Sequence, residues 1–385
     1  MASLAPDQAR LDGLARQGIA ALQAGNAGAA RSAFEAIAAS GRASPQAWLL
    51  LAQACDMADD RAAARAALSE VLKADPANPY ALVMHGELMT RDGDDRGAVH
   101  WYERALAAAS GKQLPPDLIT RLRRADAERN AAGARFRASL DKALGATGAA
   151  AGARFAEALD IVSGRAVPML QQPTSFFYPG LPQTAFHDPA DFAWVAGLAA
   201  AYPAIAAEAE AVLAARAGLA PYVEPVEGRH NKAHPLLSDP RWSAFHLVRS
   251  GEIVPENAAR CPATMAALAD LPIPRIAGHS PMLLFSILAP GTHIPPHNGM
   301  LNTRLICHLP LIVPPDCGLR VGNHVREVRA GEVLIFDDSI EHEAWNRSDR
   351  PRAILLFEIW NPALSAAERA ALTAMYETVA SYGEE

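Results

Sequence analysis

One stretch of the sequence decides the fold, namely Gly291-Thr292-His293-Ile294-Pro295-Pro296-His297-Asn298-Gly299. The apolar run 282–289 leads into it, and the mostly apolar run 304–313 leads out of it. This pattern predicts a strand, a tight turn rich in proline and glycine, and a second strand. A histidine in a turn at the rim of a β-barrel is well placed to bind a metal ion.

A second histidine of the same kind, His342, follows His297 after 45 residues, within the segment 336–345. Two histidines on adjacent barrel strands suit a divalent first-row metal, so we expect these two to meet and hold one ion. Non-haem iron sites usually add a carboxylate two residues after the first histidine, where this chain has Gly299. The nearby candidates for a substitute carboxylate are Asp337, Asp338 and Glu341.

Polar residues in the flanking strands indicate a site for a carboxylate-bearing cosubstrate. Arg352 begins the last apolar strand, and a buried arginine can hold a carboxylate through two parallel hydrogen bonds. Arg304 and His308 share one face of their strand because their numbers have the same parity. Ser286, in the strand before the turn, adds a hydroxyl donor. A surface salt bridge is the alternative interpretation of Arg352 taken alone.

Short strands joined by turns of proline and glycine predict a double-sheet jelly roll, as in cupins, for the C-terminal half. Two helices should precede it, one beginning at Asp188-Pro189 and running through residue 195, the other at about 204–217. The predicted strands are 242–249, 282–289, 303–313, 319–321, 333–336 and 353–359.

The N-terminal part shows a repeat of 34 residues over about 11–44, 45–78 and 79–112. It resembles the tetratricopeptide repeat, in which two antiparallel helices pack closely at small residues. We expect Gly18, Ala52 and Gly86 to meet Ala30, Ala64 and Ala98, while Phe34, Leu68 and Tyr102 fill the gap to the next repeat. Such arrays bind peptides or proteins along one face. The alternative is that the repeats only stabilise or dimerise the chain.

These patterns together predict an α+β multidomain chain. A helical repeat domain should occupy residues 8–145, including a capping helix at about 117–144, and a helical linker should occupy 146–170. The segment 145–152, rich in glycine and alanine, is the expected hinge. The jelly-roll domain should occupy residues 171–375.

Bulk properties exclude some classes of protein and suggest a location. A net charge of −7 argues against a nucleic-acid-binding protein, which would carry a basic stripe. No apolar run reaches the length of a membrane span, and the N-terminus lacks the pattern of a signal peptide. The four cysteines show no CxxC spacing, so we expect reduced thiols in a cytoplasmic protein.

The C-terminal motifs resemble the aspartyl/asparaginyl β-hydroxylase family over about residues 170–370. The matching segments are 285–286, 290–299, 304–309, 334–343 and 360–362. The resemblance implies an oxygenase that depends on Fe(II) and 2-oxoglutarate, hydroxylates an Asp or Asn side chain of a peptide or protein, and releases succinate and CO2. Hydroxylation of a lipid or another non-peptide substrate is the nearest alternative. A non-catalytic repeat adaptor with a degenerate barrel is the alternative from another class.

The resemblance also implies roles for particular residues. His297 and His342 would be the metal ligands, and the absence of a carboxylate at Gly299 agrees with the family. The 2-oxoglutarate contacts would be Ser286, His308 and Arg352. One departure concerns Ile306, where the animal enzyme has an arginine. Either Arg304 or a lysine elsewhere substitutes for it in binding the cosubstrate, or that carboxylate is held differently.

Overall fold

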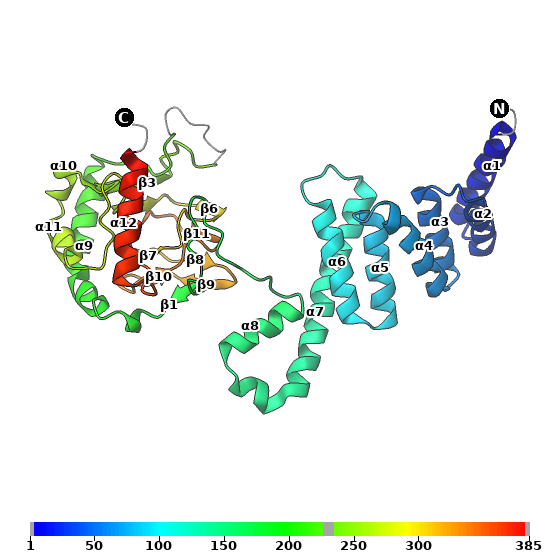
Figure 1. The fold of residues 1–385 in the computed structure, drawn as a ribbon, viewed down its shortest axis with the longest axis horizontal. Helices are drawn as coiled ribbons and strands as arrows, with labels where there is room; N and C mark the ends of the chain where they lie inside the picture. The colour runs from blue at the N-terminus through cyan, green and yellow to red at the C-terminus, as the bar shows by residue number, and fades with distance from the viewer. Residues whose placement is uncertain (1–3, 226–234, 382–385) are drawn as a thin grey trace. The chain divides into compact units, whose positions relative to one another are not determined.

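The computed structural model describes residues 4–225 and 235–381, apart from the side chains at the two ends of this range. The chain forms two compact units, Met1–Pro168 and Met169–Glu385 (Figure 1). The first is helical, and the second is built around two β-sheets. The structure is therefore an α+β multidomain fold, as the sequence predicts.

Three successive helix pairs build most of the N-terminal unit, which confirms the tetratricopeptide-like array. Asn26, Ser44, Asp60, Asn78 and Asp94 each cap the start of a helix, their side chains accepting a backbone N–H bond. The helices are α1 (Leu4–Gln23), α2 (Ala27–Ala39), α3 (Pro45–Met57), α4 (Arg61–Ala74), α5 (Pro79–Asp92), α6 (Asp95–Ala109), α7 (Pro116–Ala150) and α8 (Ala153–Val162). Within α7, Gly145 has non-helical backbone angles, at the start of the expected hinge.

The contacts of the repeat glycines differ in detail from the prediction. A Cβ atom at Gly18 would lie 2.7 Å from the Phe34 ring, and one at Gly86 would overlap the Tyr102 ring. The nearest atoms to each glycine therefore belong to the large residue of the second helix, rather than to the predicted alanine. The glycines make room for an aromatic ring inside the repeat.

Gly86→Ala should destabilise the repeat unit by about 1–3 kcal/mol, because the added methyl group overpacks the contact with Tyr102. Gly13→Ala is the matched control, since nothing lies within 4 Å of its added Cβ. That change should leave stability unchanged or raise it by about 0.5–1 kcal/mol through helix propensity. Urea unfolding of the full chain, followed by circular dichroism, measures both. Equal effects at the two positions would contradict the packing argument.

The C-terminal unit contains an eight-stranded sheet and a four-stranded sheet, the two layers expected of a jelly roll. The large sheet has the order β1-β10-β7-β12-β5-β3-β2, with β4 paired to β3, and the small sheet has the order β6-β11-β8-β9. Strands of the large sheet are β1 (Phe186–His187), β2 (Ala220–Pro221), β3 (Trp242–Arg249), β4 (Glu252–Ile253), β5 (Leu283–Leu288), β7 (Arg304–Ile312), β10 (Leu334–Phe336) and β12 (Arg352–Trp360). Those of the small sheet are β6 (Thr292–His297), β8 (Cys317–Val321), β9 (His324–Glu327) and β11 (His342–Asn346).

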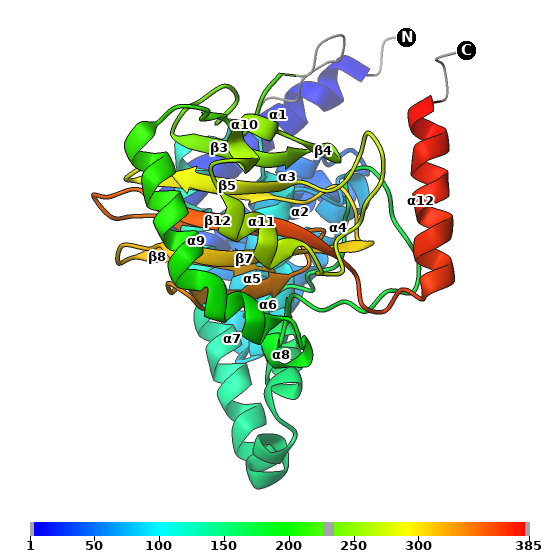
Figure 2. The same cartoon turned by 90° about the vertical axis from the view of Figure 1, so that its left-hand side faces the viewer.

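The two faces of the large sheet have different partners, and the alternation of side chains along each strand decides which residue faces which partner. Odd-numbered residues such as Phe285, Cys307 and Phe357 pack in one core with α9 (Val195–Ala215) and α11 (Pro262–Leu268), which cover that face (Figure 2). Even-numbered residues pack in a second core with the small sheet, among them Leu284, Ile306 and Leu356. Ser286, Arg304, His308 and Arg352 are also even-numbered and belong to this inner face. The remaining helical segments are η1 (Pro189–Asp191), α10 (Pro255–Ala258) and α12 (Ala366–Ser381).

Three predicted elements were wrong, one turn and two helices. The residues 292–297, predicted as a turn, form β6, because they pair with β11 across the small sheet. The two helices predicted before the sheet are instead the short η1 and one continuous α9, with Pro203 inside it. Packing of α9 on the sheet outweighs the cost of about 3 kcal/mol that proline imposes on a helix interior.

Among the helices that the structure describes, α9 alone is long and apolar enough to cross a membrane, judged by length and composition. This corrects the expectation that no segment would reach that length. Leu198, Ile205, Ala209 and Val212 of this helix are nevertheless buried in the core beside the large sheet. A core helix passes the same test, so the composition of α9 is weak evidence for a membrane span.

Candidate functional site

The structure brings His297 and His342 together on adjacent strands of the small sheet. They are paired across β6 and β11, and their ring centroids lie 4.1 Å apart. Each ring donates its Nδ1–H to a nearby carbonyl oxygen, His297 to Pro295 at 2.8 Å and His342 to Ile340 at 3.1 Å. These bonds leave Nε2 as the nitrogen that bears a lone pair. Burial lowers the pKa of His342 to about 4, so its imidazole is neutral near pH 7.

An irregularity in the pairing of β6 and β11 sets the direction of His297. Ile294 pairs with Ala344 and His297 with His342, so three steps along β6 match two steps along β11. This is the register of a β-bulge, which turns the following side chain to the other face of the sheet. Pro295 and Pro296 lie in the bulge, where their missing N–H groups remove no ladder bond. His297 therefore faces inward, whereas strict alternation would group it with the outward-facing His293.

Of the three candidate carboxylates near His342, only Asp338 lines the pocket with the histidines. Asp337 accepts hydrogen bonds from Gln171 and Ser339, and Glu341 pairs with Arg320. The Oδ1 atom of Asp338 is buried and has no hydrogen-bond partner in the described structure. Burial raises the pKa of Asp338 to about 6, and the nearby Arg304 opposes part of that effect. Across residues 4–225 and 235–381, no group of three or more His, Cys, Asp or Glu side chains is arranged to hold a metal ion.

Gly299 lacks a side chain because Asp338 occupies that space. A Cβ atom at position 299 would overlap the Asp338 carboxylate. Gly299→Ala should therefore destabilise the C-terminal unit by about 1–3 kcal/mol. Asp338→Ala in the same chain should remove most of that cost, so the two changes should be non-additive in thermal unfolding. Additive effects would show that the two positions do not compete for space.

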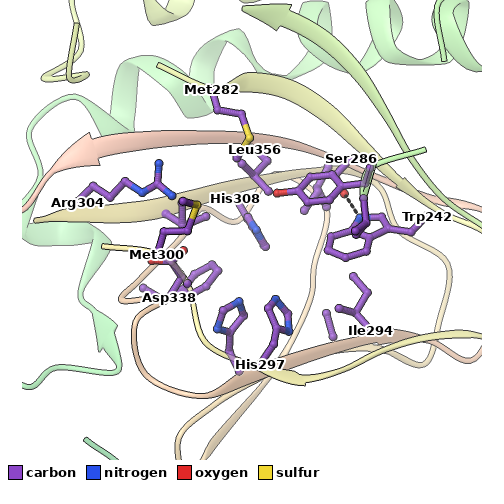
Figure 3. A pocket seen from close by; sticks show the side chains of 18 of the residues that line it. Trp242, Met282, Ser286, Ile294, His297, Met300, Arg304, His308, Asp338 and Leu356 are labelled. Carbon is purple, nitrogen blue, oxygen red and sulfur yellow. Dashed lines mark hydrogen bonds between the residues drawn. The ribbon is translucent and has the colours of Figure 1, made fainter. Parts of the chain in front are cut away.

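The large sheet contributes a second group of polar residues to the same cavity, whose volume is about 620 Å3. Arg352 is 1% exposed, and its Nε atom has no hydrogen-bond partner among the described residues. Burial lowers its pKa to about 10 and the pKa of His308 to well below its usual range. Trp242 donates its indole N–H to the Ser286 hydroxyl at 3.1 Å. In Figure 3, Trp242 and Ser286 lie at one end of the pocket, and Arg304 and Asp338 at the other.

Arg304, the fourth predicted cosubstrate residue, already has a carboxylate partner. It forms a buried ion pair with Glu358 of the neighbouring strand β12. Ile306 lies directly opposite Glu358 in the register of β7 and β12. Glu358 was not predicted as a site residue. Its position was nevertheless informative, because it is an acidic residue within the apolar run 353–359 and its even number places it on the inner face of the sheet. His230, a loop histidine that the sequence offers as a substrate contact, and the segment 227–228, which also fits the family resemblance, lie outside the described residues.

The interior of the jelly roll brings together two histidines, a buried arginine and the Asp338 carboxylate, and sequence comparison shows which family this part of the chain is similar to. Residues 199–362 match the aspartyl/asparaginyl β-hydroxylase family, and residues 21–88 match the tetratricopeptide repeat. Residues 199–362 are therefore similar to the aspartyl/asparaginyl β-hydroxylase family, and the part of the chain before them is similar to tetratricopeptide repeats. The resemblance seen in the sequence motifs is confirmed.

Individual relatives differ in their described activities. The chain is 37% identical over 193 residues to the ornithine lipid ester-linked acyl 2-hydroxylase of Rhizobium tropici. This alignment covers 49% of this chain and 65% of that protein. It is 38% identical over 136 residues to the human aspartyl/asparaginyl β-hydroxylase, and the alignment covers 35% of this chain and 18% of that protein. It is 38% identical over 137 residues to the human aspartate β-hydroxylase domain-containing protein 2, and the alignment covers 34% of this chain and 36% of that protein. The chain thus spans less than two thirds of the length of each of these relatives.

Proposed function

We propose that this chain is a hydroxylase that uses Fe(II) and 2-oxoglutarate. The single observation that carries the proposal is the convergence of two adjacent histidines and a buried arginine that has no carboxylate partner among the described residues in one cavity. Similarity to the β-hydroxylase family supports the reaction class. The cofactors, the residue roles and the substrate are parts of the proposal.

The residues present fit a divalent metal ion. His297 and His342 would hold it through their Nε2 atoms, since each Nδ1–H is already bonded to a carbonyl oxygen. Asp338 supports the fit because its buried Oδ1 atom, which has no hydrogen-bond partner, lies in the same pocket, where a water molecule bound to the metal would satisfy it. Iron(II) bound here would activate O2, of which one oxygen atom would enter succinate as 2-oxoglutarate loses CO2 and the other would enter the hydroxylated product.

The residues of the large sheet fit the dicarboxylate. Arg352 would bind the carboxylate that is remote from the metal, because a guanidinium forms two parallel bonds to such a group. The Ser286 hydroxyl and His308 would add polar contacts to the same molecule. The phenyl ring of Phe336, which contacts His308 at a centroid distance of 4.8 Å, helps to exclude water from the site.

Three functions are considered for the whole chain: a peptide or protein hydroxylase, a hydroxylase of a non-peptide substrate, and a non-catalytic adaptor. The family description favours hydroxylation of an Asp or Asn side chain in a peptide or protein, with the repeats presenting that partner. The similarity to an acyl hydroxylase over half of the chain favours a lipid or another non-peptide substrate. A non-catalytic adaptor is disfavoured by Arg352, since an unpaired buried charge is costly unless an anion completes it.

Calorimetry with manganese(II) in place of iron tests the proposal without turnover. 2-Oxoglutarate should bind to the metal-loaded protein and much more weakly to the metal-free protein. The iron-loaded protein should then release succinate from 2-oxoglutarate in air. Absence of metal-dependent 2-oxoglutarate binding would rule out both the cofactor assignment and the enzyme, and would leave the adaptor.

A further inference from the structure

We propose that the buried pair of Arg304 and Glu358 determines substrate specificity, by neutralising the cation that would otherwise bind an acidic side chain. The group that enters the pocket to react is then an uncharged hydrocarbon chain, of the kind found in an ester-linked or amide-linked acyl group. This inference rests on the proposed function, whose substrate class it names.

Each arginine of the described pocket lining either has a carboxylate partner or is assigned to 2-oxoglutarate. Its three arginines are Arg249, Arg304 and Arg352. Arg249 pairs with Glu224, and Arg304 pairs with Glu358. Arg352 lies on the part of the inner face assigned to 2-oxoglutarate. In the described lining, no guanidinium therefore remains for a carboxylate on the substrate.

The pair lies in the wall of the pocket, where the Arg304 side chain is 12% exposed and its carboxylate partner is fully buried. Glu358 is 0% exposed, and its other oxygen accepts a hydrogen bond from the Met282 backbone N–H at 3.3 Å. The residue opposite Glu358 on β7 is Ile306, so the strand pairing brings no second positive charge next to Glu358. Asp338 is close enough to interact electrostatically with both Arg304 and Glu358. Two carboxylates therefore face one guanidinium, and a third carboxylate entering from a substrate would meet repulsion.

The rest of the wall is suited to hydrocarbon. Tyr222 and Trp242 stack with ring centroids 4.0 Å apart and form a flat surface on one side. Each methylene group buried against such a wall contributes about 0.8 kcal/mol, so several of them supply affinity without any ion pair. Met282 and Met300 can adapt to a chain of irregular path. The other apolar residues of the lining include Ile294, Leu319, Ile354 and Leu356.

Two probes of equal length isolate the charge that enters the pocket. The first is N-octanoylglycinamide, and the second is the same molecule with the terminal methyl group replaced by a carboxylate. Calorimetry of each, with and without manganese(II) and 2-oxoglutarate, should show that the uncharged probe binds at least about tenfold more tightly, which corresponds to about 1.4 kcal/mol. An Asp-containing peptide should behave like the charged probe. Equal binding of the two probes, tighter binding of the charged one, or binding of neither would overturn the inference.

Removing the negative charge of Glu358 should reverse the preference. Glu358→Gln removes the carboxylate that is paired with Arg304 and leaves only the more weakly interacting Asp338 nearby, so affinity for the carboxylate probe should rise at least about tenfold relative to the uncharged probe. Glu327→Gln makes the same change in net charge at an exposed ion pair with Arg329 and should leave the preference unaltered. An unchanged preference in a folded Glu358→Gln protein would overturn the assignment of the pair.

A second variant covers the case in which Glu358→Gln does not fold. Replacing both partners, Arg304→Met with Glu358→Gln, removes the buried charges together and should retain the preference for the uncharged probe. A preference for the carboxylate probe in that double variant would contradict the inference. Loss of metal-dependent 2-oxoglutarate binding in the unmodified chain would instead refute the proposed function, while the preference between the probes would still be measured.

Discussion

Arg352→Met is expected to abolish the binding of 2-oxoglutarate while leaving the ligand-free protein at least as stable as the unmodified chain. Burial lowers the pKa of Arg352 to about 10, which means that the folded protein disfavours its charged form. Near pH 7 that burial costs on the order of a few kcal/mol, because no described carboxylate offsets it. Methionine removes this cost, and it also removes the only guanidinium of the described lining that lacks a carboxylate partner.

The loss of affinity should be large. Breaking a buried, doubly bonded charge pair costs about 3–5 kcal/mol, so the dissociation constant of 2-oxoglutarate should rise by a factor on the order of 100 to 5,000. Arg352→Lys is the matched control, since it keeps the charge and loses the planar fork, and it should retain part of the affinity. Thermal unfolding with and without 2-oxoglutarate measures both effects. A methionine variant that is strongly destabilised without ligand and still stabilised by 2-oxoglutarate would contradict this role.

Replacing either His297 or His342 with alanine is expected to reduce metal affinity by at least about 100-fold. With only two protein nitrogens proposed as ligands, each substitution removes half of the set, and no third described His, Cys, Asp or Glu completes it. Titration with cobalt(II), followed by visible absorption, measures affinity independently of turnover. Both variants should keep the fold, since alanine at either position leaves the strand pairing of β6 and β11 in place.

His293→Ala is the control for both histidine variants. It lies on the same strand as His297, but its side chain is 52% exposed and its Nε2 atom bonds to Glu343 at 2.7 Å. Cobalt affinity should therefore stay within about twofold of the unmodified chain, given that surface pairs of this kind contribute about 0–1 kcal/mol. A loss at His293 as large as that at His297 would mean that the direction of β6 has been misassigned.

Much of the architecture could be predicted from local sequence patterns, because helix pairing within a repeat and the alternation of side chains along a strand depend on residues that are close in sequence. The 34-residue spacing specifies helix pairs, and alternation along residues 304–312 places Arg304 and His308 on one face. The continuous helix through Pro203 could not be predicted, since contacts with the distant large sheet outweigh the proline. The contact between Gly86 and the Tyr102 ring could not be predicted from the repeat pattern either, because how closely the ring approaches the glycine depends on the packing of the two helices.

The candidate site divides in the same way. The sequence by itself determined the chemical inventory of this protein: two histidines in matching contexts, an arginine at the head of an apolar strand, and a glycine in place of a carboxylate. Only the tertiary structure decided the direction of each group. A bulge at Pro295 and Pro296 turns His297 inward, and Glu358 neutralises Arg304 from the next strand. The physical reason is that strand register and charge pairing join residues distant in sequence, and no local pattern records them.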